Sequence, residues 1–167
     1  GAGISQAIGT GGRDIKDEIG GISFLQGIRL LSVDIGTKII LLVAKPPDSA
    51  VLSKIAASLK EVLKPVVTVF LGADGDLIKG ENIHSASTLE EGALVAAALS
   101  TRKDPGSVHR DLAERDNRLR ERAALEAARL GLGRKYVRGL FSGGTFCSEA
   151  QIILMGMGLV VFSNVPA

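Results

Sequence analysis

The chain has 167 residues, which is enough for one domain, or for one domain and a piece of another. Its residues are 46% hydrophobic and 23% charged, a balance that is typical of globular proteins and excludes a disordered chain. The net charge is only +2, but residues 102–138 carry eleven Lys and Arg against six Asp and Glu. The remaining residues carry nine against twelve, so the basic charge is confined to one segment.

The sequence also argues against a membrane, secreted or metal-binding protein. Its longest apolar runs, residues 39–44 and 153–162, are shorter than the roughly 18 residues that a membrane span needs. No basic leader precedes an apolar stretch, and the single cysteine, Cys147, cannot form an internal disulfide. No Cys and His residues have the spacing of a metal site. We therefore expect a cytoplasmic protein with no bound metal.

Residues 1–100 alternate between apolar stretches typical of buried strands and stretches with helical apolar spacing. Strands are expected at residues 3–9, 38–45, 65–72 and 82–87. Helices are expected from Arg13 or Asp14, from about residue 48 to residue 63, and after Thr88. Thr88 and Glu91 have the spacing of a capping box. Aliphatic residues dominate and aromatic residues are few, so we predict an α/β fold with a doubly wound parallel sheet.

Residues 101–133 are expected to form one long connecting helix. Asp104 suits the N-cap and Pro105 the first helical position, and no strong helix breaker follows before Gly131. A narrow apolar stripe runs along this charged helix and consists of Leu112, Leu119, Ala123 and Leu130. A solvated connector is the simplest interpretation, and a surface for an acidic partner is the alternative. Nucleic-acid binding is not expected, because aromatic stacking platforms are missing.

Residues 134–167 have the pattern of a new α/β unit, with a strand "KYVRGLF", a loop "SGGT", a helix "FCSEAQIILMGMG" and a strand "LVVFSN". We therefore expect three parts. They are an α/β domain at 1–100, a charged connecting helix at 101–133, and the start of a second α/β domain at 134–167.

Two glycine loops are candidate anion sites, because each is expected to follow a strand and open a helix. The amides of a first helical turn have no partner within the helix and bind phosphate or carboxylate groups. The first loop comprises Gly9, Thr10, Gly11, Gly12 and Arg13, and the second comprises Ser142, Gly143, Gly144 and Thr145. A tight turn that needs glycine for its backbone geometry is the alternative interpretation of either loop.

Other single residues have weaker signals. Lys45 ends an expected strand and is a candidate cation for the same anionic substrate. His84 is a catalytic candidate, because it lies in an expected strand near the sheet's carboxyl edge. Cys147 falls in the first turn of an expected helix, where a thiolate is favoured, although a buried inert thiol is the commoner case.

Four stretches occur in this order: "AIGTGGRDIKDEIGGISFLQGIRLLSVDIGTKIILLVAKPP", "KPVVTVFLGAD", "IHSASTLEEGA" and "YVRGLFSGGTFCSEA". Together they resemble the FdrA family of acyl-CoA synthetase-like proteins, relatives of the α subunit of succinyl-CoA synthetase. The resemblance implies that residues 1–100 form a flavodoxin-like ligase domain and that residues 134–167 open a further ligase-like domain. It also implies CoA as a cofactor and an upstream CoA-binding-type domain.

In such ligases the glycine loops help to hold a phosphohistidine in a "GHAGA" loop. The nearest match in this chain is "IHSAS" around His84, and Lys45 in "AKPP" stands where the ligases have a Glu-Gly-Gly-type turn. FdrA-like proteins also resemble a subunit of oxamate carbamoyltransferase, which handles carbamoyl phosphate without a phosphohistidine. A cation at Lys45 suits that free anionic substrate.

Three hypotheses follow. The first is a fragment of an FdrA-type protein that binds CoA or an acyl or carbamoyl phosphate for acyl or carbamoyl transfer. The second is an NTP-dependent acyl-CoA ligase that uses His84 as a phosphohistidine. The third is a non-catalytic subunit-assembly module that works through the charged helix. The expected partners are a small anionic substrate and other domains or subunits, in an oligomer, with no nucleic acid and no membrane.

Overall fold

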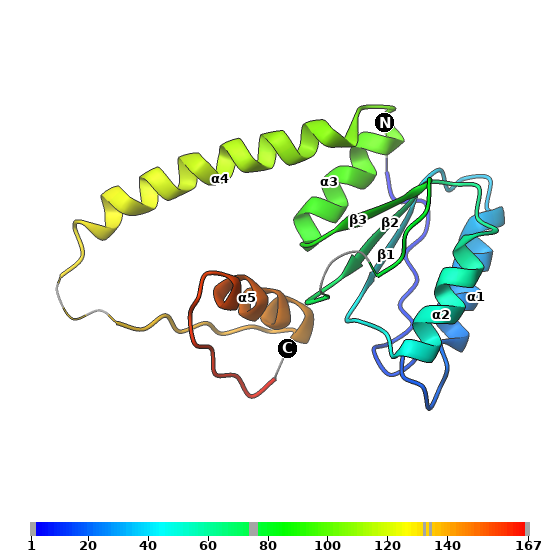
Figure 1. Ribbon diagram of the computed structural model, residues 1–167, viewed down its shortest axis with the longest axis horizontal. Helices are drawn as coiled ribbons and strands as arrows, with labels where there is room; N and C mark the ends of the chain where they lie inside the picture. The colour runs from blue at the N-terminus through cyan, green and yellow to red at the C-terminus, as the bar shows by residue number, and fades with distance from the viewer. Residues whose placement is uncertain (1–2, 74–76, 132, 134, 166–167) are drawn as a thin grey trace. The chain divides into compact units, whose positions relative to one another are not determined.

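The computed structural model describes residues 3–73, 77–131, 133 and 135–165. It divides the chain into two compact units, Gly1–Lys103 and Asp104–Ala167. The first unit is a mixed α/β structure, and the second contains two helices among its described residues (Figure 1).

A small parallel sheet forms the centre of the first unit. Its strands are β1 (Ile40–Ala44), β2 (Val66–Phe70) and β3 (Ile83–Ala86), in the order β1-β2-β3. In the register, Ile40 lies opposite Val66, and Val66 lies opposite Ile83. All five residues of β2 are buried, as expected for a central parallel strand covered on both faces. The predicted α/β class and parallel sheet are thus confirmed.

Helices cover both faces of the sheet. Helices α1 (Ile22–Val33) and α2 (Ser49–Leu59) contact each other on one face, and α3 (Leu89–Ser100) contacts all three strands on the other (Figure 1). The predicted capping box at the start of α3 is present, because the N–H of Glu91 donates to Thr88 Oγ1 at 3.1 Å. The side chain of Glu91 in turn accepts from the N–H of Ser87 at 2.7 Å.

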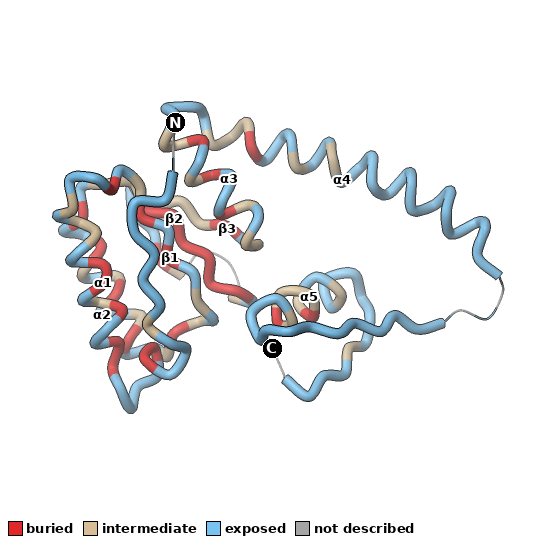
Figure 2. Tube along the Cα trace, turned by 180° about the vertical axis from the view of Figure 1, so that it is seen from behind, coloured by how far each residue is buried: buried red, intermediate tan, exposed pale blue. Residues whose placement is uncertain are grey.

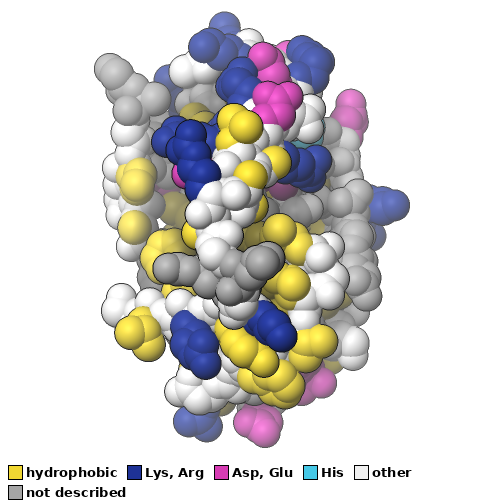
Figure 3. Space-filling view, turned by 90° about the vertical axis from the view of Figure 1, so that its left-hand side faces the viewer, with side chains coloured by type: hydrophobic (Ala, Val, Ile, Leu, Met, Phe, Trp, Pro, Cys, Tyr) yellow, Lys and Arg dark blue, Asp and Glu magenta, His cyan; other side chains and the backbone are white. Residues whose placement is uncertain are grey.

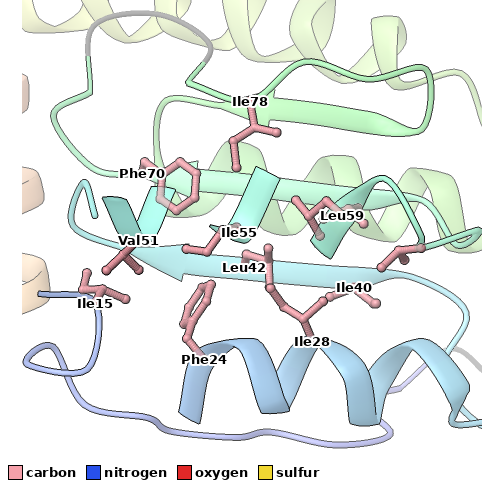
Figure 4. Packing of buried hydrophobic residues seen from close by; sticks show 12 residues of the cluster. Ile15, Phe24, Ile28, Ile40, Leu42, Val51, Ile55, Leu59, Phe70 and Ile78 are labelled. Carbon is pink, nitrogen blue, oxygen red and sulfur yellow. The ribbon is translucent and has the colours of Figure 1, made fainter. Parts of the chain in front are cut away.

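The hydrophobic core lies between α1, α2 and the sheet. Figure 4 shows its aliphatic and aromatic side chains meeting from these elements. The cluster comprises Ile15, Phe24, Ile28, Ile40, Leu42, Val51, Ile55, Leu59, Val62, Val66, Phe70 and Ile78. Each large apolar side chain that is fully buried contributes about 1.5–3 kcal/mol, so this face supplies most of the stability of the first unit.

The first predicted strand and the start of the first predicted helix are both wrong. Residues 3–9 form no strand, and Ile4 is 87% exposed, because these residues make no ladder with the sheet. Helix α1 begins at Ile22 instead of Arg13 or Asp14. Gly20 and Gly21 have φ angles of +79° and +77°, a left-handed backbone that interrupts any helix. The residues before them form turns.

The second unit begins with α4 (Pro105–Ala127), and α5 (Gly144–Gly156) follows. The predicted cap of α4 is confirmed, because Asp104 Oδ1 accepts from the N–H of Gly106 at 2.9 Å. The helix ends at Ala127, a turn earlier than Gly131.

The two strands predicted around α5 are also wrong. Residues 135–141 and 159–163 have no strand structure, since neither pairs with another strand in the part of the chain that the structure describes. Their large apolar side chains are exposed as a result, among them Leu140 at 102% and Phe162 at 93%. Apolar alternation alone does not make a strand, because the backbone N–H and C=O groups need a partner.

Candidate anion-binding site

The first glycine loop, residues 9–13, is a turn that does not open a helix. The N–H of Asp14 donates to the carbonyl of Gly11 at 3.2 Å, and Gly11 has a φ of +78°. Thr10 is half-buried, whereas Gly9, Gly12 and Arg13 are exposed. The predicted helix amides are therefore not adjacent to this loop.

The N-terminus of α1 is occupied by a side chain of the protein itself. Asp14 is 5% exposed, and its carboxylate accepts from the N–H of Ser23 at 2.9 Å and of Phe24 at 2.8 Å. Burial raises the pKa of Asp14, but the hydrogen bonds from Ser23 and Phe24 together outweigh it, so the pKa lies below its usual value. The amides that the sequence suggested for a ligand are bound to this carboxylate.

A second carboxylate fixes the same region to α2. Asp48 Oδ1 accepts from Lys16 Nζ at 2.9 Å, and Asp48 Oδ2 accepts from the N–H of Asp17 at 3.0 Å. The bond from Lys16, followed by that from Asp17, lowers the pKa of Asp48. The N–H of Asp48 also donates to the carbonyl of Ile15 at 3.2 Å. The turn between residues 14 and 20 is thus tied to the start of α2.

Lys45 and His84 lie in different places in the first unit. Lys45 directly follows β1, at the carboxyl edge of the sheet, and is exposed. His84 lies opposite Val67 in the interior of β3 and is half-buried. His84 and Ala86 are two residues apart in β3, so their side chains lie on the same face of the sheet. A Cβ added at Gly92 of α3 would lie 3.8 Å from Ala86, so α3 covers this face. His84 therefore faces α3, whereas Ile15, which follows the first loop, packs on the opposite face.

The second glycine loop does open a helix, as predicted. Gly143 is the N-cap of α5, makes no side-chain cap, and has an extended backbone. Ser142 and Thr145 are exposed, and a Cβ added at Gly143 or Gly144 would meet nothing within 4 Å. The first residues of α5 are therefore exposed, and the amides of a first helical turn favour an anion.

One buried hydroxyl beside this loop was missed from the sequence. Ser148 is 1% exposed, and its Oγ has no hydrogen-bond partner among the described residues. Ser148 lies one turn after Gly144 in α5. Buried polar groups are nearly always hydrogen-bonded, so a buried hydroxyl without a partner is unusual. A serine in a helical pattern gives no such signal.

The contacts of Cys147 indicate a structural role. It is half-buried, and Gln151 Nε2 lies 3.4 Å from its Sγ and donates to its carbonyl at 3.1 Å. The same Gln151 Nε2 donates to the carbonyl of Val165 at 2.7 Å, and Cys147 Sγ lies 3.6 Å from Ser163 Oγ. These contacts fasten the segment after α5 to the helix. They give Cys147 no general base.

Neither a metal centre nor a membrane span is found among the described residues. No group of three or more His, Cys, Asp or Glu side chains there is arranged to hold a metal ion. No described helix is both long enough and apolar enough to cross a membrane.

Comparison with known proteins gives one informative relative. No protein-family model matches the chain. The chain is 39% identical over 165 residues to a protein of Escherichia coli (strain K12) named uncharacterized protein YahF. The similarity covers 99% of this chain but only 31% of the length of that protein. The relative is therefore much longer, and its name describes no activity.

Proposed function

We propose that this chain is part of an FdrA-type acyl-CoA synthetase-like protein and binds an anionic acyl or carbamoyl donor at the start of α5. The substrate class is CoA or an acyl or carbamoyl phosphate, and the reaction is acyl or carbamoyl transfer. The four ordered motifs support the family, and the parallel sheet with helices on both faces suits a doubly wound, flavodoxin-like ligase domain.

The buried, unpartnered hydroxyl of Ser148 is the observation that carries the site. It lies one turn after Gly144, and the first turn of α5 contains no carboxylate that would compete for its amides. The start of α1 differs, since Asp14 already holds its amides. In the proposed reaction, fixed amides and hydroxyls at α5 bind the phosphate or carboxylate and stabilise the negative charge that develops on a leaving phosphate.

The direct test is calorimetric titration of the chain with carbamoyl phosphate, CoA and inorganic phosphate. We expect saturable binding of at least one of them, and loss of that binding in Gly144→Asp, because the new carboxylate would occupy the amides and repel the anion. Gly12→Asp is the matched control, since a Cβ there also meets open space. Binding that is lost in Gly12→Asp and retained in Gly144→Asp would move the site to the first loop.

The phosphohistidine alternative predicts acid-labile phosphate on His84. His84 lies within β3 and on the face covered by α3, whereas a phosphate-carrying histidine must reach a nucleotide. Labelling with nucleotide in the presence of the remaining domains, with His84→Ala as the control, distinguishes the two mechanisms. Label that depends on His84 would favour the ligase reaction over carbamoyl or acyl transfer without a phosphohistidine.

A further inference from the structure

The second half of α4 is exposed along its whole circumference. Every residue from Asp116 to Ala127 is exposed, and Leu119 and Leu125 are 54% and 67% exposed. Figure 2 shows this as a continuous pale-blue stretch of α4. A helix of 23 residues that buries so little of itself gains little from packing, so its apolar side chains are available to a partner.

Leucines and arginines recur along α4 with a seven-residue spacing, and Leu112 and Arg115 are half-buried. Leu112 and Leu119 are one repeat apart, and each is followed three residues later by an arginine, Arg115 and Arg122. Arg118 falls on the same side, because residues three and four apart share a helix face. Three residues of the apolar stripe, Leu112, Leu119 and Ala123, lie within α4. We call Arg115, Arg118 and Arg122 the basic row.

The basic row lies along one side of the apolar stripe. At 3.6 residues per turn, its three arginines fall within a single sector that also holds Asp111, and Glu126 lies at the edge of that sector nearest the stripe. Arg118 pairs with Glu114 at 2.9 Å, and Arg115 with Asp116 at 3.2 Å. Arg118 and Glu114 are largely solvent-exposed, so their pair contributes little and exchanges readily for a partner's carboxylates, whereas Arg115 is half-buried. Figure 3 shows, in dark blue and yellow, Lys and Arg side chains and hydrophobic side chains that reach the surface.

The charge pattern selects the kind of partner. In an antiparallel pair of α4 helices, the basic row of one copy would face the basic row of the other, which is repulsive. In a parallel pair, the row would face Asp116 and Arg120, whose charges cancel. A lipid surface is disfavoured because α4 has no aromatic residue and carries carboxylates around its circumference.

We propose that α4 is a docking surface for an amphipathic helix of another polypeptide, one whose apolar stripe is bordered by Asp and Glu. The partner's leucine-type side chains pack on Leu112, Leu119 and Ala123, and its carboxylates pair with Arg115, Arg118 and Arg122. This is the pairing by which apolar seams and flanking charges select helical partners. The surface is separate from the first turn of α5, so it does not depend on the proposed substrate site.

The test uses the complete 167-residue chain and a labelled synthetic peptide of about three heptads, with Leu along one face and Glu beside it. Fluorescence anisotropy should show saturable binding. Arg118→Glu/Arg122→Glu should weaken it by about tenfold or more, since reversal of two facing charges turns attraction into repulsion. Leu119→Asp should also abolish it. Circular dichroism checks that each variant keeps its helices.

The matched control is Arg110→Glu/Arg120→Glu, which changes the net charge equally but on other sides of α4. We expect binding within about twofold of the unchanged chain, because these arginines lie away from the basic row. Equal weakening by both double variants, equal binding of a scrambled peptide, or no binding would overturn the proposal. Tighter binding of phosphatidylglycerol vesicles or of duplex RNA than of the peptide would also overturn it.

Discussion

At the scale of single residues, two buried polar groups have opposite roles. Both carboxylate oxygens of Asp14 accept a hydrogen bond, from the N–H groups of Ser23 and Phe24 at the start of α1. Ser148 is unused, because its hydroxyl has no partner among the described residues. A polar group that is paired in the folded state stabilises it, whereas one that is buried without a partner costs free energy. The first is therefore structural and the second is a candidate for ligand binding.

Replacement of Asp14 by Asn should lower the free energy of unfolding at neutral pH by about 1–3 kcal/mol, because one of the two amides loses its acceptor and the other keeps only an uncharged one. Urea denaturation measures the change. Asp17→Asn is the control, since Asp17 is exposed, and it should change the free energy by less than about 0.5 kcal/mol. Equal losses in both variants would contradict a specific role for Asp14.

The Asp14 contribution should also depend on pH. Its pKa in the folded state is lower than the usual 3.8, so folding favours the charged form. The stabilisation is then complete well above pH 3.8 and is lost as the pH falls through the lower folded pKa. The contribution of Asp34 to stability should also be lost as the pH falls, because hydrogen bonds from the hydroxyl of Thr37 and then from the N–H of Gly36 lower its pKa. The difference in unfolding free energy between the unchanged chain and Asp14→Asn should shrink between pH 6 and about pH 3.

Unlike Asp14→Asn, the variant Ser148→Ala should not lower the free energy of unfolding. Without ligand, its free energy of unfolding should be unchanged or higher by up to about 1 kcal/mol, because an unpaired buried hydroxyl is removed. Binding of the anion that the titration identifies should nevertheless weaken. Strong destabilisation without ligand would mean that the hydroxyl has a structural partner, and the α5 site would lose its main support.

At the scale of secondary-structure elements, side-chain caps and close packing set the positions of the helices. Helix α3 begins where Thr88 and Glu91 satisfy backbone N–H groups, and both residues are readable from the sequence. Its approach to the sheet is set by Gly92, where a Cβ would overlap the side chain of Val69. No local pattern reveals that contact, because Gly92 and Val69 belong to different elements.

Gly92→Ala should therefore destabilise the first unit by about 1–3 kcal/mol, although alanine is the better helix former. Thermal unfolding followed by circular dichroism measures it. Gly156→Ala in α5 is the control, because a Cβ there meets nothing within 4 Å, and it should be neutral or stabilising. A stable Gly92→Ala variant would mean that α3 shifts away from the sheet at little cost.

At the scale of the whole molecule, the main cluster of buried apolar side chains belongs to one unit. The buried apolar cluster spans Ile15 to Ile78, entirely within the first unit, whereas residues 135–165 expose many large apolar side chains. We therefore expect a fragment of residues 1–103 to unfold cooperatively, with the same urea midpoint as the complete chain. A clearly lower midpoint in the fragment would show that the second unit stabilises the first.

The sequence by itself determined the α/β class, the three strands β1–β3, the caps of α3 and α4, and the glycine loop that opens α5. Each depends on residues close together in the chain, through apolar periodicity or a hydrogen bond across one helical turn. Only the tertiary structure decided which apolar stretches pair as strands, since residues 3–9, 135–141 and 159–163 have similar patterns but no ladder partner. It also decided that Asp14 accepts from the amides at the start of α1 and that Ser148 Oγ has no partner among the residues that the structure describes. Burial and hydrogen bonding between separate segments are properties of the folded chain, so local sequence does not contain them.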